Sequence, residues 1–503
     1  MKKKIRVRFA PSPTGALHIG GLRTALYNFL YAKKKKGDFI LRIEDTDIKR
    51  NIKYSINYIL KSLKWCKIKY NEGYNKNGKY YPYIQSKRIP IYKKYLNYLI
   101  KKEYVYYSFE TKTELKEYKK NNKNFIYNSL TRNKLKNSLT LNKTLINNYI
   151  KNKNFVIRIK TPNNKNITFY DKIYGKIKIN TNEIDDKILF RSNYTPTYHL
   201  ANVIDDHIMK ITHIIRGKEW IYSTPIHIIL YNFFKWNLPK FVHLPLLLNS
   251  NKNGKISKRL NIINNNIPIY PINYKKLSIN NSYKDKGFLP DAFINIIALL
   301  GWSPNKNYNN NIYSIKEMIK LFNLNNINKS DVHLNYNKFC WINKQYINNS
   351  NNKYINKILY NYLKKKIDNT KIKKKYIIKI IKLTKNRISL INEIWDVTYY
   401  FFINPIKFII PNNMILFIKK EYKKIIFFLK KKELFFKKKR NKEEIENFLN
   451  NIDDINLLKI LRISIVGKLI GINLLYILYL INFNIIKNRI KKFKKFIIYQ
   501  YKI

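Results

Sequence analysis

The stretch that decides the fold is residues 8–21, Arg-Phe-Ala-Pro-Ser-Pro-Thr-Gly-Ala-Leu-His-Ile-Gly-Gly. It begins as an extended run, passes through a turn rich in proline and glycine, and continues over 22–30 with apolar residues at helical spacing. This pattern predicts a strand, a tight loop and the start of a helix. At such a junction glycines let a ligand approach the backbone, and the first N–H groups and the helix dipole favour an anion. We therefore expect a phosphate-binding loop; a strand-turn-helix without a ligand is the alternative.

The composition sets broad limits on the protein. A chain of 503 residues is too long for one hydrophobic core and predicts roughly three to five structural units. It carries 100 Lys and Arg against 30 Asp and Glu, a formal net charge of +70, which would attract a polyanion such as RNA. Lys, Asn, Ile and Tyr crowd every region, however, as expected when drift favours codons made of A and T. The charge therefore supports RNA binding without demonstrating it.

Cysteine usage and hydropathy bear on the compartment. Cys66 and Cys340 lie far apart and neither has a CxxC partner, so the sequence supports neither a disulfide framework nor a thiolate metal site, and a reducing compartment is expected. No targeting segment precedes Arg8, which favours a cytoplasmic protein. The apolar run 469–483 is interrupted by glycine and asparagine and is too short for a membrane span, so it predicts a buried helix.

Four further motifs follow the first along the chain. They are Leu-Arg-Ile-Glu-Asp-Thr-Asp at 41–47, Tyr-Ile-Gln-Ser at 83–86, Thr-Tyr-His-Leu-Ala-Asn at 197–202 and Lys-Ile-Ser-Lys-Arg at 255–259. In this order and spacing they resemble the motifs of class I aminoacyl-tRNA synthetases, with 18–21 similar to the HIGH signature and 255–259 similar to the KMSKS loop. The residues at 11–15 narrow the resemblance to glutamyl-tRNA synthetases of bacterial type. The resemblance covers essentially the full length and is strongest before residue 302.

The resemblance and the alternation of strands with helices predict an α/β fold. We expect a Rossmann-like catalytic domain of the class I synthetases, with an inserted acceptor-end-binding domain, followed by an α-helical anticodon-binding region. The expected boundaries are 1–88 and 189–250 for the two catalytic halves, 89–188 for the insertion, 251–335 for a stem-contact region with the Lys255 loop, and 336–503 for the helical region.

Local patterns predict individual elements. Strands are expected at 39–43, 155–160, 173–179 and 207–215, and helices at 51–65, 91–102, 224–234, 292–300 and 315–322. The Asn-rich segment 261–286 predicts a surface loop.

The resemblance implies that glutamate and ATP form glutamyl-adenylate, and that the glutamyl group is then transferred to the terminal adenosine of tRNA-Glu. Mg²⁺ would assist the phosphates, and the protein would be a monomer. Attack of a carboxylate on the α-phosphate brings two anions together, so positioning and positive potential supply most of the catalysis. By resemblance the catalytic residues are His18, Lys255 and Lys258, and the ATP contacts are His18, Gly20, Gly21, Lys255, Ser257 and Lys258.

Selection of glutamate calls for donors to two carboxylates, and arginine suits them because it pairs bidentately and stays charged. The resemblance places six residues around the amino acid: Arg8, Ser12, Glu44, Tyr198, Asn202 and Arg216. Among these, Glu44 would accept the α-ammonium and Arg8 would bind the side-chain carboxylate.

Some of these residues also have plainer interpretations. The acidic run 44–47 follows an apolar strand, where it would suit a cation or a helix cap, and capping is the role we expect for Asp47. Tyr198 and Asn202 are four residues apart and would share a helical face. A satisfied polar pair in the core is the alternative for them.

Two further predictions concern metal and tRNA. Some relatives bind zinc through two cysteines near the start of the inserted domain, whereas this chain has Ser108 and Glu110 there, so no zinc is expected. Arg387 resembles the arginine with which bacterial relatives recognise the third anticodon base, since a guanidinium can make two hydrogen bonds to one base edge. A surface arginine without a base contact is the alternative.

The sequence also allows alternative functions to be weighed. A non-catalytic RNA-binding protein derived from a synthetase is disfavoured because Arg8, Glu44 and Lys258 are all present. A shorter relative that glutamylates a queuosine base lacks the anticodon-binding half, and the residues beyond 335 argue against it. Glutaminyl-tRNA synthetases carry other residues at the proline-rich and acidic motifs. Whether tRNA-Gln is also charged stays open, and the resemblance implies that tRNA binds before glutamate is activated.

Overall fold

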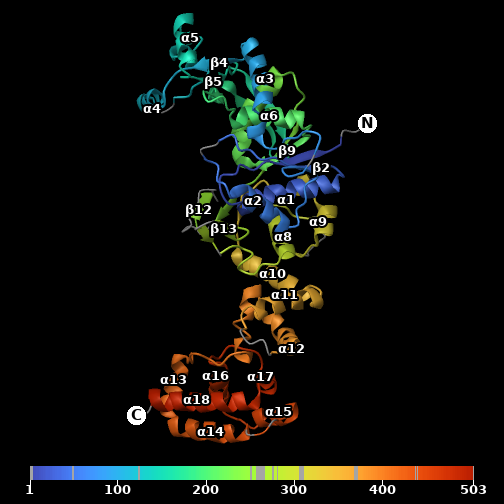
Figure 1. Ribbon diagram of the computed structural model, residues 1–503, viewed down its shortest axis with the longest axis vertical. Coiled ribbons are helices and arrows are strands. Elements are labelled where there is room, and N and C mark those ends of the chain that lie inside the picture. The colour runs from blue at the N-terminus through green and yellow to red at the C-terminus, as the bar shows by residue number, and fades with distance from the viewer. Residues whose placement is uncertain are drawn as a thin grey trace. The chain divides into compact units, whose positions relative to one another are not determined.

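The computed structural model describes residues 4–47, 50–76, 78–122, 125–249, 252–255, 267–274, 277–279, 281–304, 311–367, 372–436, 438 and 440–501. These residues form two compact units (Figure 1). The first unit comprises Met1–Asp285 and Pro290–Ile342, and the second comprises Lys286–Leu289 and Asn343–Ile503.

The first unit is built on two groups of mainly parallel strands. One group has the order β1 (Arg6–Phe9), β2 (Asp38–Leu41), β3 (Glu72–Gly73), and the other has the order β9 (His213–Gly217), β10 (Lys240–Leu244), β6 (Asn166–Asp171), β7 (Gly175–Asn180), with β7 antiparallel. Thr212 joins the groups, because its backbone N–H donates to the carbonyl of Arg6 at 2.9 Å and its hydroxyl accepts from the Arg6 N–H at 2.9 Å. Strands β1 and β9 therefore lie side by side, where the strand order reverses. Open α/β sheets bind ligands at the carboxyl ends of strands at such a point.

Helices cross between these strands. They include α1 (Ile19–Lys34) between β1 and β2, α2 (Ser55–Trp65) between β2 and β3, α6 (Tyr198–Ile208) before β9 and α7 (Thr224–Phe233) before β10. Helix α1 buries the apolar face expected from its spacing, with Leu22, Ala25, Leu26 and Leu30 all almost inaccessible. The β1–α1 junction therefore has the strand-loop-helix form predicted for residues 8–30.

A second, antiparallel sheet lies between β3 and β9 in the sequence. Its strands are β4 (Val105–Ser108), β5 (Val156–Ile159) and β8 (Ile188–Arg191), accompanied by α3 (Ile89–Lys101), α4 (Lys112–Asn121) and α5 (Lys143–Lys151). Figure 1 shows α4 and α5 beside β4 and β5 at one end of the unit. One apolar cluster joins α3 and the sheet to α6 and α7 through residues such as Leu96, Ile157, Leu200 and Ile229. This shared core ties the inserted segment to the helix that carries Tyr198 and Asn202.

The rest of the first unit contains two helices that pack on α1. Its elements are β11 (Leu247–Asn249), β12 (Lys252–Lys255), β13 (Ile272–Tyr274), β14 (Leu277–Ile279), α8 (Pro290–Ala298), α9 (Ile315–Leu321), β15 (Val332–His333) and the start of α10 (Tyr336–Asn349). Arg23 and Tyr27 of α1 donate to carbonyls at the end of α8, with Arg23 Nη1 3.1 Å from the Leu300 oxygen and Tyr27 Oη 3.0 Å from the Ala298 oxygen. These buried bonds fix α8 against the phosphate-loop helix.

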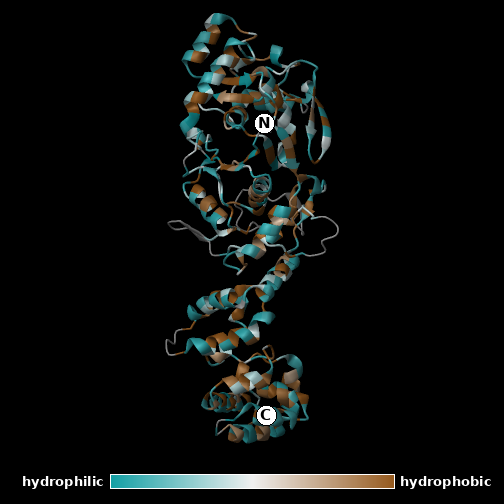
Figure 2. Ribbon diagram, turned by 90° about the vertical axis from the view of Figure 1, so that its right-hand side faces the viewer, coloured by the Kyte–Doolittle hydropathy of each residue, from teal (hydrophilic) through white to brown (hydrophobic). Residues whose placement is uncertain are grey.

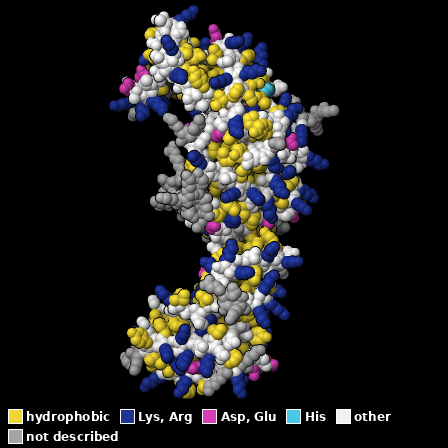
Figure 3. All heavy atoms as spheres, viewed as in Figure 1, with side chains coloured by type: hydrophobic (Ala, Val, Ile, Leu, Met, Phe, Trp, Pro, Cys, Tyr) yellow, Lys and Arg dark blue, Asp and Glu magenta, His cyan; other side chains and the backbone are white. Residues whose placement is uncertain are grey.

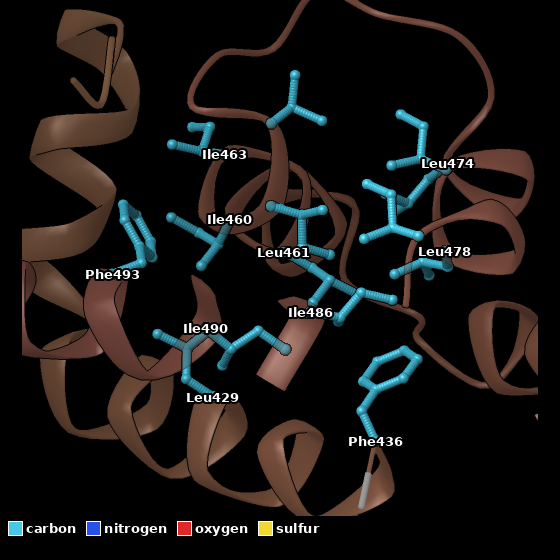
Figure 4. Packing of buried hydrophobic residues seen from close by; sticks show 14 of the residues in the cluster. Leu429, Phe436, Ile460, Leu461, Ile463, Leu474, Leu478, Ile486, Ile490 and Phe493 are labelled. Atoms are coloured by element: carbon cyan, nitrogen blue, oxygen red, sulfur yellow. The ribbon is translucent and has the colours of Figure 1, made fainter. Parts of the chain in front are cut away.

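The regular structure described in the second unit is helical. Its longer elements are α11 (Asn352–Lys364), α12 (Lys374–Thr384), α13 (Asn412–Lys420), α14 (Tyr422–Phe435), α15 (Lys442–Asn450), α16 (Ile455–Val466), α17 (Leu474–Leu480) and α18 (Phe483–Tyr501). In the core, Ile460 and Leu461 of α16 lie among Leu429, Ile490 and Phe493 of α14 and α18 (Figure 4). Polar and apolar residues share each helix, as amphipathic packing requires (Figure 2).

Three predicted elements need correction. The strand expected at 207–215 is wrong at its start, because α6 continues through Ile208 and β9 begins at His213; the ring of His207 stacks on Trp236 at 3.7 Å instead of joining a strand. The loop expected at 261–286 is wrong where β13 pairs antiparallel with β14, and its residues 261–266, 275–276 and 280 lie outside the described residues. The helix expected at 469–483 is shorter, since Asn473 caps α17 by accepting from the Leu475 N–H at 2.9 Å.

Surface charge is spread widely. In Figure 3 lysine and arginine side chains dot the visible face of both units, with few acidic side chains between them. Such a distribution agrees with the compositional bias in the sequence. Within the described parts of the chain, no helix is long and apolar enough to cross a membrane.

Candidate active site

A pocket of about 170 Å³ lies at the carboxyl ends of β1 and β9. Nine residues predicted from the sequence to bind ATP or glutamate line it: Arg8, Ser12, His18, Gly20, Gly21, Glu44, Tyr198, Asn202 and Arg216. They come from four segments far apart in the sequence. The fold therefore gathers them at the strand-order reversal, where a ligand site is expected.

His18 organises the start of α1. It is the N-cap residue, and its Nδ1 accepts from the N–H of Gly20 at 3.1 Å and from that of Gly21 at 3.4 Å. The first N–H groups, which the sequence predicts to favour an anion, thus already have an acceptor in the imidazole. A Cβ on Gly20 would stand 3.0 Å from His18 Cε1, and one on Gly21 would stand 2.6 Å from Leu17 Cδ1. Larger residues would therefore disturb the cap.

Arg8 and Glu44 bring opposite charges to the pocket. Arg8 is 3% exposed and donates from Nε to both carboxylate oxygens of Asp206, at 3.0 and 3.1 Å. Glu44 is 7% exposed, and its Oε1 accepts from Arg42 Nη2 and from Asn202 Nδ2, each at 2.9 Å. Burial raises the pKa of Glu44, and the Arg42 guanidinium opposes that shift.

Hydrogen-bond acceptors surround the guanidinium of Arg216. Its Nε donates to His243 Nε2 at 3.0 Å, and Nη2 donates to Thr224 Oγ1 at 2.9 Å and to the Trp220 carbonyl at 3.5 Å. Its Nη1 donates to Tyr198 Oη at 3.1 Å and to His227 Nδ1 at 3.2 Å. Every N–H of the guanidinium therefore has an acceptor within the protein. A carboxylate that binds Arg216 would have to displace one of them.

The imidazoles around Arg216 are neutral in the folded protein. Burial lowers the pKa of His243 to about 4, and burial also lowers the pKa of His227 well below its ordinary value, with Arg216 adding to that shift. Neutral rings offer the lone pairs that a guanidinium needs. The cluster thus orients Arg216 without placing a second cation beside it.

A wider pocket of about 760 Å³ adjoins the first and shares Ser12, His18, Glu44 and Tyr198 with it. Its walls also carry the basic residues Arg50, Arg158, Lys187 and Arg191. Two of these, Arg158 and Arg191, come from the strands of the inserted sheet. Asp47, Asp185 and Glu219 also line the wide pocket, so a polyanion that enters it would meet side chains of both signs on the way to the small pocket.

Asp45 and Asp47 of the acidic run 44–47 contact different parts of the structure. Asp47 does not cap α2, because that helix begins at Ser55 without a side-chain cap; the Asp47 carboxylate lies 3.7 Å from Arg50 Nη1, and residues 48 and 49 lie outside the described residues. Asp45 accepts from the Ser86 N–H at 2.8 Å, in the first turn of the short 3₁₀ helix Gln85–Arg88. The Asp45 carboxylate therefore satisfies one N–H in the first turn of that 3₁₀ helix.

The position compared with zinc sites of relatives holds a polar cluster. Ser108 Oγ lies 2.7 Å from Glu110 Oε2 and accepts from Arg158 Nε at 3.0 Å. The hydroxyl of Tyr127 donates to Glu110 Oε1 at 3.1 Å, and the Arg158 guanidinium lies 4.0 Å from the centre of the Tyr127 ring. No group of three or more His, Cys, Asp or Glu that could hold a metal occurs among the residues whose structure is described.

Of the remaining predicted residues, the structure describes Lys255 and Arg387. Lys255 ends strand β12, and Ser257 and Lys258 lie outside the described residues. In the second unit, Arg387 donates from Nη1 to the Gly471 carbonyl at 2.9 Å. It lines a pocket of about 520 Å³ that also includes Lys459, Arg462 and several leucines.

Sequence reasoning missed the residues behind the pocket. Arg42, Asp206 and His243 are fully buried and contact Glu44, Arg8 and Arg216 respectively. A signal was present for two of them, because Arg42 and Asp206 are charged residues placed within apolar stretches, and such buried charges need partners. His243 gave no comparable signal.

Comparison with known proteins identifies the chain. The family model described as tRNA synthetases class I (E and Q), catalytic domain, matches residues 4–341. The chain belongs to this synthetase family. The glutamate–tRNA ligase of Azobacteroides pseudotrichonymphae is 43% identical over 409 residues, 80% of each chain, and that of Bacteroides thetaiotaomicron is 42% identical over 413 residues, 81% of each chain. This synthetase also matches the crystal structure of a glutamate tRNA ligase from Elizabethkingia meningosepticum in complex with its amino acid. That match has a TM-score of 0.86 and 36% identity, and it covers 98% of this chain and 99% of the other.

These matches test several expectations for the synthetase. The family resemblance, the class I α/β fold with a helical C-terminal region, and the identification as an aminoacyl-tRNA synthetase are confirmed. The predicted roles of single residues and the predicted domain boundaries stay predictions.

Proposed function

We propose that this synthetase is a glutamate–tRNA ligase, which activates glutamate with ATP and transfers it to the 3′ end of tRNA-Glu. The observation that carries the proposal is the small pocket, where Arg8 and Arg216 from adjacent strand ends and the carboxylate of Glu44 line one space. These charges complement the two carboxylates and the ammonium of glutamate. The relatives of similar length carry the same activity in their names.

Arg8 is assigned to the side-chain carboxylate of glutamate. Within the described residues its hydrogen bonds run from Nε to Asp206, which leaves both terminal nitrogens for a ligand in the pocket. Glu44, steadied by Asn202, is assigned to the α-ammonium. Arg216 holds Tyr198 Oη at the pocket wall, so its contact with glutamate would run directly or through that hydroxyl.

ATP is assigned to the start of α1. The helix N-terminus at Gly20 and Gly21 supplies a positive dipole end for the phosphates, and His18 fixes the loop that leads into it. Lys255, Ser257 and Lys258 are assigned to the triphosphate on the grounds of their sequence motif. Mg²⁺ enters as part of the substrate, bound to the ATP phosphates. The family's chemistry needs no covalent enzyme intermediate.

The acceptor end of tRNA is assigned to the wider pocket. Its basic side chains Arg158, Lys187 and Arg191 suit a phosphodiester backbone, and its shared wall at Ser12 and Tyr198 leads to the amino acid. This assignment supports an acceptor-binding role for the inserted segment 89–188. The helical region 336–503 is assigned to the anticodon, with Arg387 at its pocket of about 520 Å³. We further propose a monomer that works in the cytoplasm.

Charging of a tRNA-Glu transcript with labelled glutamate tests the proposed function. The full-length protein should esterify glutamate and reject glutamine, and Arg8→Ala should raise the KM for glutamate. Pyrophosphate exchange with and without tRNA shows whether tRNA must bind before activation. A protein that binds tRNA but forms no glutamyl ester would favour the non-catalytic alternative.

A further inference from the structure

A chain of four charged side chains runs behind the small pocket. Arg8 Nε donates to both oxygens of Asp206 at 3.0 and 3.1 Å, and Asp206 Oδ1 also accepts from Arg42 Nη1 at 2.7 Å. Arg42 Nη2 then donates to Glu44 Oε1 at 2.9 Å. The first and the last member of this series of ion pairs, Arg8 and Glu44, therefore both line the small pocket.

The two middle members do not reach the pocket. Arg42 and Asp206 are both fully buried and are absent from the walls of the small and the wide pockets, whereas Arg8 and Glu44 line the small one. Their hydrogen bonds to the lining of the small pocket run to Arg8 and Glu44.

The geometry of arginine makes this link rigid. The two terminal nitrogens of Arg42 bond to two different carboxylates, and the planar guanidinium fixes the spacing between those bonds. Burial alone would raise the pKa of Asp206, but the guanidiniums of Arg8 and Arg42 hold that pKa below its ordinary value. If one member of such a buried ion pair is removed, the charge of its partner stays buried without compensation.

We propose that Arg42 and Asp206 are positioning residues that set the location of Arg8 relative to Glu44. Glutamate carries its side-chain carboxylate and its ammonium at two ends of one molecule, so a fixed relation between Arg8 and Glu44 contributes to amino-acid selection. The inference rests on the proposed function, because it assigns Arg8 and Glu44 to glutamate.

The neighbouring carboxylate provides a matched control. Asp205 precedes Asp206 on α6 and is equally buried, but it accepts from Arg88 Nε at 2.7 Å, Gln85 Nε2 at 2.9 Å and Tyr92 Oη at 2.8 Å. The nearest ion-pair distance from Asp205 to Arg42 is 3.7 Å, to Nε. Asp205→Asn thus removes a buried carboxylate from the same helix without cutting the link between Arg8 and Glu44.

The test compares full-length Asp206→Asn, Arg42→Lys and Asp205→Asn in tRNA charging. The first two should raise the KM for glutamate by about 10- to 100-fold, the range expected when a binding group is slightly misplaced. The KM for ATP should stay near the wild-type value, and the ratio of kcat/KM for glutamate to that for glutamine should fall. Asp205→Asn should lower the melting temperature comparably but leave the glutamate KM and this ratio near wild type.

Three outcomes would overturn the inference. An unchanged glutamate KM in Asp206→Asn or Arg42→Lys would do so, as would an equal rise in Asp205→Asn, which would indicate a purely structural effect. If Asp206→Asn does not fold, Arg42→Lys provides the test, because lysine keeps the positive charge but lacks the two terminal nitrogens that bond to the two carboxylates. A wild-type protein that charges no tRNA with glutamate would instead overturn the proposed function, and this inference with it.

Discussion

Arg216 donates from Nε to Nε2 of His243 across 3.0 Å, and this bond fixes the tautomer of the imidazole. Because Nε2 accepts, the ring proton lies on Nδ1, which donates to Asp171 Oδ2 at 2.8 Å. Asp171 therefore orients an arginine of the candidate glutamate pocket through a histidine.

Asp171→Asn should lower kcat/KM for glutamate. An amide can donate to Nδ1, which permits the ring proton to move to Nε2, where it would face the Arg216 N–H. The loss of a buried bond to a charged group predicts an effect of about 1 to 3 kcal/mol. Steady-state charging measures it. His213→Gln is the control, because His213 lies on β9, the strand of Arg216, and bonds to Tyr31 instead of to Arg216. An equal loss of efficiency in the control would refute the orienting role.

The buried histidines predict that stability falls in mild acid. Burial lowers the pKa values of His199, His213 and His243 from 6.5 to about 4. Between these values the unfolded chain binds protons that the folded chain does not, so stability is complete above pH 6.5 and declines as the pH falls towards 4. Each shift corresponds to roughly 3 kcal/mol at most. Urea unfolding from pH 7.5 to 4.5 checks this, and His243→Gln should flatten the dependence. A stability that is constant over this range would contradict the expectation.

Lys258→Ala should slow adenylate formation and leave tRNA affinity nearly intact. The lysine is assigned to charge that develops in the transition state, and loss of such a donor costs roughly 2 to 4 kcal/mol. Single-turnover kinetics measures the step. Lys64→Ala removes the same charge from the exposed face of α2 and should have no effect. An unchanged rate constant in Lys258→Ala would remove this loop from the mechanism.

The protein should remain active after exhaustive chelation of zinc. Ser108, Glu110, Tyr127 and Arg158 bond directly to one another where some relatives use thiolates, so no metal is needed to hold this segment. Metal analysis of purified protein checks the expectation. One equivalent of tightly bound zinc, lost together with activity, would show that other ligands exist.

Local sequence was sufficient for the parts of the site that depend on local geometry. The loop before α1 and the helical pair Tyr198 and Asn202 follow from residue types at short spacing, and residues of both line the small pocket. The partners of Arg216 were not predictable in this way. His243 and Thr224 reach it from other elements, and only the pairing of β9 with β10 sets His243 opposite Arg216.

The same distinction explains the errors in the fold. His207 and Ile208 belong to a short apolar run that fits either a strand or a helix, and packing of α6 on α7 decides for the helix. The roles of Asp45 and Asp47 depend on where Ser86 and Arg50 lie after folding. Spacing along the chain does not contain that information.

Arg387→Gln should weaken discrimination between tRNA-Glu and tRNA-Gln, whose anticodons differ at the third base. The pocket beside Arg387 combines a second guanidinium, Arg462, with the apolar side chains of Leu458 and Leu474, which suits the edge and face of a base. An arginine that pairs with one base edge leaves unpaired groups against another, a difference worth about 1 to 3 kcal/mol.

The comparison of kcat/KM for the two tRNAs tests this assignment. Lys382→Gln is the matched control, because it removes one positive charge from the exposed face of the neighbouring helix α12. If Lys382 contacts phosphate, its loss would lower kcat/KM for both tRNAs alike. The loss of base recognition at Arg387 would instead change the ratio of the two kcat/KM values. Equal charging of both tRNAs by the wild type would contradict the discriminating role and favour an enzyme that serves both.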